Sequence, residues 1–202
     1  MWPYRVALAG LYRIGAHAWH LTLVALTINV VCGWLLITDR HFLPGILLIP
    51  AGLFDLFDGG MARFRGEASR KGALLDATVD RVADAIIFGA LYYSVATQGQ
   101  TAEAALALSA LVVSLLVSHV RAEGEAAGLQ ISEGVFARLE RYLALVVGLT
   151  VPGALLPALA ILTGLGTITS IQRTVATWRG LGSSAGRRDG ARPRSSRRAA
   201  RQ

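Results

Sequence analysis

Four aspartates interrupt an otherwise apolar stretch of this chain, in two pairs. Asp55 and Asp58 are three residues apart, and Asp76 and Asp80 are four apart, so each pair lies on one face of a helix. The connection between the pairs is short, so we expect antiparallel neighbouring helices and four converging carboxylates. Converging carboxylates repel one another unless a cation neutralises them. All-oxygen ligands favour Mg²⁺, Mn²⁺ or Ca²⁺, and four acids suit two ions, which supports displacement at phosphorus.

Small and basic residues surround the aspartates in a way that suits a ligand containing phosphate. Gly59, Gly60 and Gly72 lack side chains at places where a ligand can approach the backbone closely. Arg63 follows Asp58 by about one turn and can contact a phosphate or a base edge. Each residue alone also fits a structural role, with acids paired to arginines and glycines in helix packing. Their combination favours a ligand site.

The acids belong to a series of six apolar segments. The chain has 202 residues, 53% of them hydrophobic, which is too apolar for a typical soluble domain. A membrane-spanning helix needs about 20 residues. We therefore predict an all-α integral membrane protein with six transmembrane helices and a short N-terminal amphipathic interfacial helix over residues 1–16. The six segments cover about residues 18–38, 43–64, 73–97, 102–124, 136–152 and 154–178.

Basic residues predict the orientation of these segments. Arg and Lys gather before the first segment, between the second and third, between the fourth and fifth, and after the sixth, whereas the opposite connections hold only Arg40. Because such an excess marks the cytoplasmic side, we predict a multi-pass protein of the cell membrane with both termini and the acidic site cytoplasmic. Residues 17–178 then form the six-helix catalytic domain.

The last 24 residues form a separate basic tail. The chain carries a net charge of +7, and residues 179–202 alone hold eight Arg and one Asp. This segment has almost nothing to bury, so we predict that it is a disordered cytoplasmic tail. A solvated tail that fixes orientation is the first interpretation, and contact with anionic lipid headgroups is the alternative. No fold signal in the sequence indicates nucleic-acid binding.

The pattern D-x2-D-G-x2-A-R-x8-G-x3-D-x3-D over residues 55–80 resembles the signature of the CDP-alcohol phosphotransferases, or CDP-alcohol phosphatidyltransferases. Those integral membrane enzymes typically have six spans. They move a phosphatidyl group from a CDP-linked lipid onto an alcohol and release CMP. The resemblance implies a transferase of phospholipid biosynthesis that acts on CDP-diacylglycerol with Mg²⁺ or Mn²⁺, two ions in all, and that is commonly a homodimer.

The resemblance also implies roles for individual residues. The metal ligands would be Asp55, Asp58, Asp76 and Asp80. Asp80 would also accept the proton of the acceptor hydroxyl, which attacks the lipid-side phosphorus directly. The residues that would bind the CDP-lipid are Gly59, Ala62, Arg63, Ser69, Gly72 and Thr27.

A second group of arginines, near the cytoplasmic ends of the last three segments, bears on the acceptor alcohol. A phosphorylated alcohol needs several basic groups, whereas a neutral alcohol does not. The sequence around these arginines resembles the actinobacterial phosphatidylinositol-phosphate synthases, which use inositol phosphate, and implies that they bind its phosphate. They are Arg121, Arg138, Arg141 and Arg173. Each alone also fits an ordinary basic residue at a helix end.

Three departures from that subfamily leave the acceptor open. Glu123 stands where a second arginine is usual, and a carboxylate there would oppose a phosphate. Ala137 and Leu139 replace the usual Glu and Pro. The stretch near the first span reads Thr-Leu-Val from Thr22, in place of Thr-Pro-Asn or Thr-Pro-Asp, although Thr27 is kept. Glycerol phosphate, as in a phosphatidylglycerol-phosphate synthase, and an uncharged alcohol remain alternatives.

Two other classes of protein fit parts of the sequence. A non-enzymatic cation-binding or transport protein would line an ion path with its acids, but polar residues would then be distributed across the bilayer, and here they gather at one face. A family member without turnover would bind CDP-lipid only. Asp84 lies outside the signature, and we predict that it has a structural role, as a partner of Arg81 or another nearby base.

Overall fold

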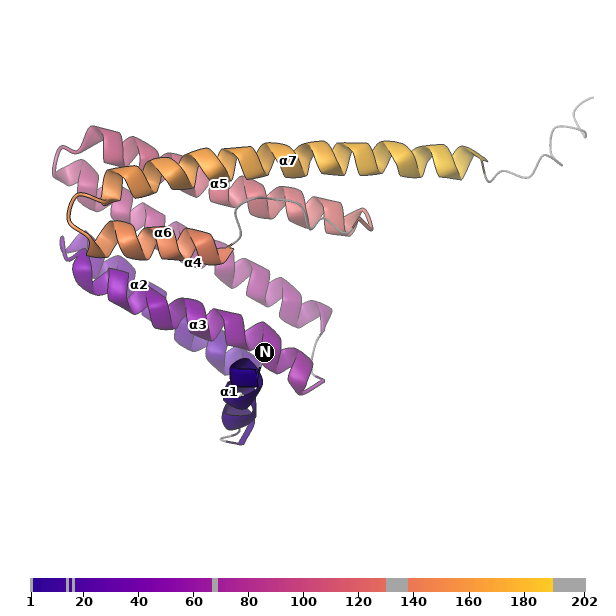
Figure 1. Ribbon diagram of the computed structural model, residues 1–202, viewed down its shortest axis with the longest axis horizontal. Helices are drawn as coiled ribbons and strands as arrows, with labels where there is room; N and C mark the ends of the chain where they lie inside the picture. The colour runs from indigo at the N-terminus through magenta and orange to yellow at the C-terminus, as the bar shows by residue number, and fades with distance from the viewer. Residues whose placement is uncertain (1, 14, 16, 67–68, 130–137, 191–202) are drawn as a thin grey trace, which may run out of the picture.

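The computed structural model describes residues 2–13, 15, 17–66, 69–129 and 138–190. Over these residues the regular structure is entirely helical, which confirms the all-α prediction, and every predicted apolar segment corresponds to one helix. The helices are α1 (Trp2–Arg13), α2 (Ala18–Ile37), α3 (Phe42–Phe64), α4 (Arg70–Thr97), α5 (Thr101–Ala126), α6 (Arg138–Thr150) and α7 (Leu155–Gly190) (Figure 1).

Four of the described helices are long and apolar enough to cross a bilayer: α2, α3, α5 and the part of α7 over Leu155–Leu181. The other two helices of the predicted six differ for identifiable reasons. α4 carries several charged residues in its first half. α6 has 13 residues, which is about 20 Å at 1.5 Å per residue and shorter than the hydrocarbon core of about 30 Å.

Helices α2 to α7 form a closed ring. Each packs against two others, in the order α2, α3, α6, α7, α5, α4 and back to α2. α3 and α4 follow each other in the chain but do not pack directly in the described residues, because α2 packs against both. The expectation that the two acid-bearing helices are direct neighbours is therefore wrong. The consequence is a gap between α3 and α4 at the start of α2.

The apolar core lies at the end of the ring that holds the α2–α3, α4–α5 and α6–α7 connections. Its fully buried residues include Leu36, Leu91 and Leu159. The connections are tight, since Gly99 and Gly153 adopt left-handed backbone angles with φ of 74° and 77°. Toward the other end the helices spread apart (Figure 1). The molecule is thus closed and apolar at one end and open at the other.

Helix α1 lies at the open end, where it packs against α3 (Figure 1). Leu8 packs with Leu21 and Met61 in a small buried cluster. The rings of Tyr12 and Phe64 meet edge to face at 5.6 Å. These contacts hold α1 beside the start of α2 and the end of α3, which border the gap.

The structure differs from the sequence prediction at the start of the basic tail. α7 continues as a helix through Gly190, whereas the predicted disordered tail begins at Arg179. Arginine is a good helix former, and the first proline after Pro157 is Pro193, so nothing forces the helix to stop earlier. Residues 191–202 of the predicted tail lie outside the described residues.

Candidate active site

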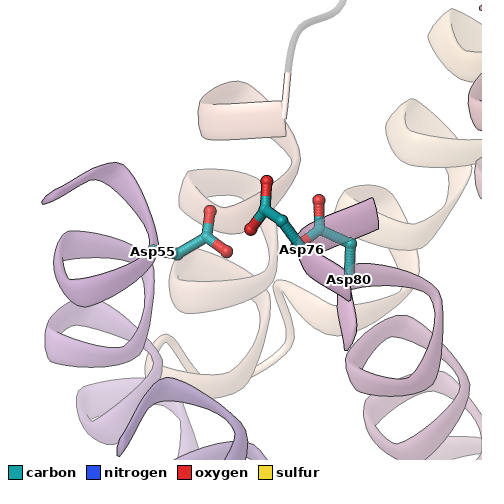
Figure 2. Close-up of side chains that lie close together, drawn as sticks. All are labelled: Asp55, Asp76 and Asp80. Carbon is teal, nitrogen blue, oxygen red and sulfur yellow. The ribbon is translucent and has the colours of Figure 1, made fainter. Parts of the chain in front are cut away.

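Three of the four predicted metal ligands meet at the gap between α3 and α4. One carboxylate oxygen from each of Asp55, Asp76 and Asp80 lies within 4.8 Å of the other two. Figure 2 shows Asp55 on α3 facing Asp76 and Asp80 on α4. Ligands of one divalent ion at about 2.0–2.6 Å from it lie no more than about 5 Å apart, so the three oxygens fit a shared cation. All-oxygen donors favour a hard ion such as Mg²⁺ or Mn²⁺.

The fourth acid has a different immediate partner. Asp58 is only 4% exposed, and its Oδ2 accepts a hydrogen bond from the Thr22 hydroxyl at 2.8 Å. Its Oδ1 accepts from the backbone N–H of Gly59. Asp76 and Asp80 are nevertheless close enough to repel its charge. Asp58 therefore lies beside the three-acid cluster and is held by the start of α2.

A pocket of about 330 Å³ opens beside these acids, within the range of small-ligand sites. Asp58 and Asp76 belong to its wall, so the acids and the pocket form one site. Five of the six residues predicted to bind the CDP-lipid line it. The complete lining is Ala18, Trp19, Thr22, Asp58, Gly59, Ala62, Arg63, Ser69, Gly72, Ala73, Leu75 and Asp76.

The local sequence explains the shape of the α4 side of this pocket. Ser69 is the N-cap of α4, and its hydroxyl accepts a hydrogen bond from the backbone N–H of Gly72 at 3.1 Å. A Cβ at position 72 would lie 3.3 Å from Ser69 Oγ, which is a tight contact. Gly72 thus lets the cap form at the mouth of the pocket. The N-terminus of α4, with its partial positive charge, faces a place suited to phosphate.

Thr27 is the exception among the predicted donor-binding residues. It is exposed, and its hydroxyl donates to the Leu23 carbonyl at 2.8 Å. Thr22 and Trp19 occupy the α2 side of the pocket instead, and the sequence prediction missed both. A signal was available in the sequence, because the small and polar residues Thr22, Ala25 and Asn29 recur at helical spacing. The structure buries all three on the inner face of α2.

Arginines of α4 and α7 contact one stripe of α5, the helix that packs against α4. Arg81 of α4 donates to the carbonyl of Ser118 at 3.3 Å. Arg173 of α7 donates to the carbonyl of Val117, also at 3.3 Å. Ser118 and Val117 are one turn from Ser114, so the three residues line the same face of α5.

Arg141 of α6 reaches the same face of α5 through side chains. Its Nη1 donates to the hydroxyl of Ser114 and lies 3.5 Å from Asp84 Oδ2. The Ser114 hydroxyl donates to the same Asp84 oxygen. The structural role predicted for Asp84 is consistent with this pairing, in which the base is Arg141 of α6.

The predicted acceptor arginines form one basic cluster only in part. Arg121 and Arg141 both repel the charge on Arg173, so each of them lies within electrostatic reach of Arg173. Arg121 is exposed and pairs with Glu125 at 2.8 Å. α6 begins at Arg138, whose side chain lies outside the described part of the structure, as does Ala137.

Glu123, the residue that opposed a phosphorylated acceptor in the sequence, lies on another face of α5. It lines a groove of about 390 Å³ between α5 and α7 with His119 and Trp178. The acid whose negative charge attracts Arg173 is Glu125. The position of Glu123 therefore weakens the sequence argument against a phosphate near Arg141 and Arg173.

Comparisons with known proteins bear on this site. The family model described as CDP-alcohol phosphatidyltransferase matches residues 16–178. The chain is 35% identical over 179 residues to the phosphatidylinositol phosphate synthase of Mycobacterium marinum, covering 84% of this chain and 76% of the relative. It is 32% identical over 179 residues to the enzyme of that name from Mycobacterium tuberculosis, covering 84% and 82%.

Solved structures give the same result for the fold. The crystal structure of the Mycobacterium tuberculosis phosphatidylinositol phosphate synthase PgsA1 with CDP-DAG bound matches with a TM-score of 0.77 and 31% identity, covering 87% of this chain and 93% of that one. The structure of PgsA1 in complex with manganese and citrate matches with a TM-score of 0.76 and 30% identity, covering 87% and 88%.

Proposed function

Because this chain belongs to the CDP-alcohol phosphatidyltransferase family, we propose that it is a phosphatidylinositol phosphate synthase, which transfers the phosphatidyl group of CDP-diacylglycerol to inositol phosphate and releases CMP. The membership confirms the resemblance predicted from the signature over residues 55–80. The observation that carries the proposal is the position of Asp76, which belongs both to the three-acid cluster and to the wall of the 330 Å³ pocket. A ligand in that pocket meets the acids directly.

The pocket suits the CDP part of the donor. Ser69 and Gly72 place the N-terminus of α4 at one side, and Arg63 provides a guanidinium at the other, both suited to phosphate oxygens. A relative of this chain has been solved with CDP-DAG bound, and another structure of it with manganese. We infer that Asp55, Asp58, Asp76 and Asp80 hold two Mg²⁺ or Mn²⁺ ions, which when bound stabilise negative charge on the pyrophosphate.

The chemistry assigned to the chain's own residues is a single displacement. Asp80 accepts the proton of the acceptor hydroxyl while that oxygen bonds to the lipid-side phosphorus. The bond from this phosphorus to the oxygen of CMP breaks, and CMP leaves with the bonding electrons. Asp80 and Arg81 are consecutive, so α4 borders both the donor pocket and the basic cluster.

The basic cluster supports a phosphorylated acceptor. Arg141 and Arg173 lie within electrostatic reach of each other, and a neutral alcohol acceptor needs no such pair. Inositol phosphate is chosen over glycerol phosphate because the relatives are named phosphatidylinositol phosphate synthases. Arg121 and Arg138 remain part of this proposal.

The membrane arrangement follows from the ring. α4 and α6 complete a ring with four helices that are each able to span, so we propose that they cross the membrane with them. α1 would lie at the cytoplasmic interface with the site and both termini. We propose a homodimer through the third and fourth spans, α4 and α5. Cross-linking in native membranes tests the dimer.

A reconstituted assay tests the activity. The purified protein in lipid nanodiscs is given CDP-diacylglycerol with inositol phosphate, glycerol phosphate or inositol, and the lipid product is read by mass spectrometry. We expect phosphatidylinositol phosphate and CMP in equal amounts, only with Mg²⁺ or Mn²⁺. Chelation should abolish the reaction, and added metal should restore it. Product from glycerol phosphate alone would overturn the acceptor assignment, and metal-dependent stabilisation without any effect of CDP would favour a cation-binding protein.

A further inference from the structure

Three polar side chains from three helices, one buried and two half-buried, meet outside the signature. Arg141 of α6, Ser114 of α5 and Asp84 of α4 form a chain of hydrogen bonds from guanidinium to hydroxyl to carboxylate. The side chains of Arg141 and Asp84 are only 15% and 12% exposed, and Ser114 is 3% exposed. The contact is therefore shielded from water, unlike the exposed pair of Arg121 and Glu125.

We propose that Asp84 and Ser114 are positioning residues that hold Arg141 in place for the phosphate of the acceptor alcohol. This inference rests on the proposed function. Arginine has five N–H donors in a rigid fork, and the contacts to Ser114 and Asp84 use the Nη1 end. The other edge is then fixed in direction and available for a phosphate, which arginine binds best through two parallel hydrogen bonds.

The need for an anchor comes from the surrounding charge. Arg173 and Arg141 repel each other, and Arg121 adds to this repulsion. Arg173 and Arg81 are tethered to backbone carbonyls of α5, but Arg141 is tethered to a carboxylate. Without Asp84, a buried guanidinium would face like charges with a neutral hydroxyl as its anchor, and it would lose its fixed orientation.

The position of Asp84 also links the acceptor side to the donor side. Asp84 lies one helical turn after Asp80, so both acids lie along one face of α4. A rigid α4 therefore fixes the assigned base and the anchor of Arg141 relative to each other. Misplacement of a bound reactant by about 1 Å can cost about 100-fold in rate, so a positioning role is chemically meaningful.

The test is a kinetic comparison of full-length variants in nanodiscs. We expect Asp84→Asn to raise KM for inositol phosphate about 10-fold, and Ser114→Ala about 3-fold, with KM for CDP-diacylglycerol changed less than 2-fold. Glu125→Gln is the matched control, because Glu125 also pairs with an arginine, Arg121, but both side chains are exposed. It should leave the acceptor KM within 2-fold. In an Arg141→Gln background, Asp84→Asn should have no further effect, which a general loss of stability would not produce.

The outcomes separate this inference from the proposed function. An unchanged or lowered acceptor KM in both variants, with an active wild-type enzyme, overturns the positioning role alone. Additive effects of Asp84→Asn and Arg141→Gln overturn it as well. If Asp84→Asn does not fold, Ser114→Ala decides the question. A wild-type protein that neither turns over inositol phosphate nor binds it in calorimetry with CDP present overturns both proposals.

Discussion

Asp39 and Asp80 lie at opposite ends of the helix ring, and their surroundings differ in kind. At the α2–α3 connection, Asp39 accepts hydrogen bonds from Ser94 Oγ and Gln98 Nε2, both at 2.9 Å. A carboxylate only accepts, so the Ser94 hydrogen belongs to Asp39, and His41 Nε2 must donate to Ser94 Oγ at 2.8 Å. These contacts join the connection between α2 and α3 to the end of α4.

At the open end, the acids have acids for neighbours. Asp80 shares its surroundings with Asp55 and Asp76, beside a pocket and at a gap that none of the described helices fills. Asp39 is exposed, and its hydrogen bonds from two neutral donors of α4 stabilise the fold by joining the connection to that helix. Carboxylates that surround one another require a cation, so they stabilise a ligand complex at the expense of the empty fold. The same residue type therefore serves structure at one end and chemistry at the other.

The largest expected effect is the replacement of the assigned base. Asp80→Asn keeps the size of the side chain but cannot accept the proton, so we expect turnover to fall about 10²–10⁴-fold. The melting temperature should not fall, because the substitution relieves repulsion among the acids. Release of CMP and thermal unfolding of the same preparation measure the two quantities. Wild-type turnover in this variant would show that the open end does not use Asp80 as its base.

Local patterns in the sequence predicted the helices that carry the site. Which helices are neighbours, and which side chains pair between them, depends on long-range packing. The apolar runs predicted α2 to α6 to within three residues at each end. The spacing of Asp76 and Asp80 placed them on one face, and they do share the cluster. The insertion of α2 between α3 and α4 could not be read from a short connection, because it depends on which apolar faces fit together. For the same reason the partner of Asp84 on α6 was not identifiable, since the two residues are far apart in sequence.

A second prediction tests whether Thr22 keeps Asp58 in position beside the other acids of the open end. Thr22→Val keeps the shape of the side chain but removes the hydroxyl that donates to Asp58 at 2.8 Å. We expect about a 10-fold loss in kcat/KM, mainly as a higher Mg²⁺ requirement, because a hydrogen bond to a charged group is worth about 1.5–3 kcal/mol.

Thr27→Val is the matched variant for this test. It is the same substitution in the same helix, but the hydroxyl of Thr27 donates to the Leu23 carbonyl on an exposed face. The structure predicts a change of less than about 2-fold in kcat/KM, in line with a surface substitution. Equal losses in the two variants would restore Thr27 to the donor site, where the sequence resemblance places it.

The third prediction reverses the expected effects at the closed end. Ser94 is fully buried, and Ser94→Ala leaves His41 and Asp39 without the hydroxyl that joins them. We expect a loss of about 1–3 kcal/mol in the free energy of unfolding, with kcat and both KM values unchanged. Denaturant unfolding and the nanodisc assay measure these separately. A loss of turnover without a loss of stability would contradict the assignment of a structural role to the closed end and a catalytic role to the open end.

The smallest expected effect is a pH dependence of stability at the closed end. Burial lowers the pKa of His41, although the charge of Asp39 partly opposes this shift. In the unfolded chain histidine has a pKa of about 6.5, so on acidification the unfolded state binds the proton first and stability falls as pH drops below that value. The hydrogen bonds from Ser94 and Gln98 lower the pKa of Asp39, which acts in the same direction only below about pH 4.

A variant that lacks only His41 isolates this contribution. His41→Gln retains a donor for Ser94 but does not titrate, so the melting temperatures of wild type and variant should converge between pH 7.5 and 5.5. Thermal unfolding in detergent at the two pH values measures the difference, and the other histidines cancel in the comparison. A constant difference would mean that His41 is as well solvated in the folded protein as in the unfolded chain. The stability of the closed end would then come mainly from the apolar core around Leu36 and Leu91. The hydrogen bonds of Asp39 would contribute little.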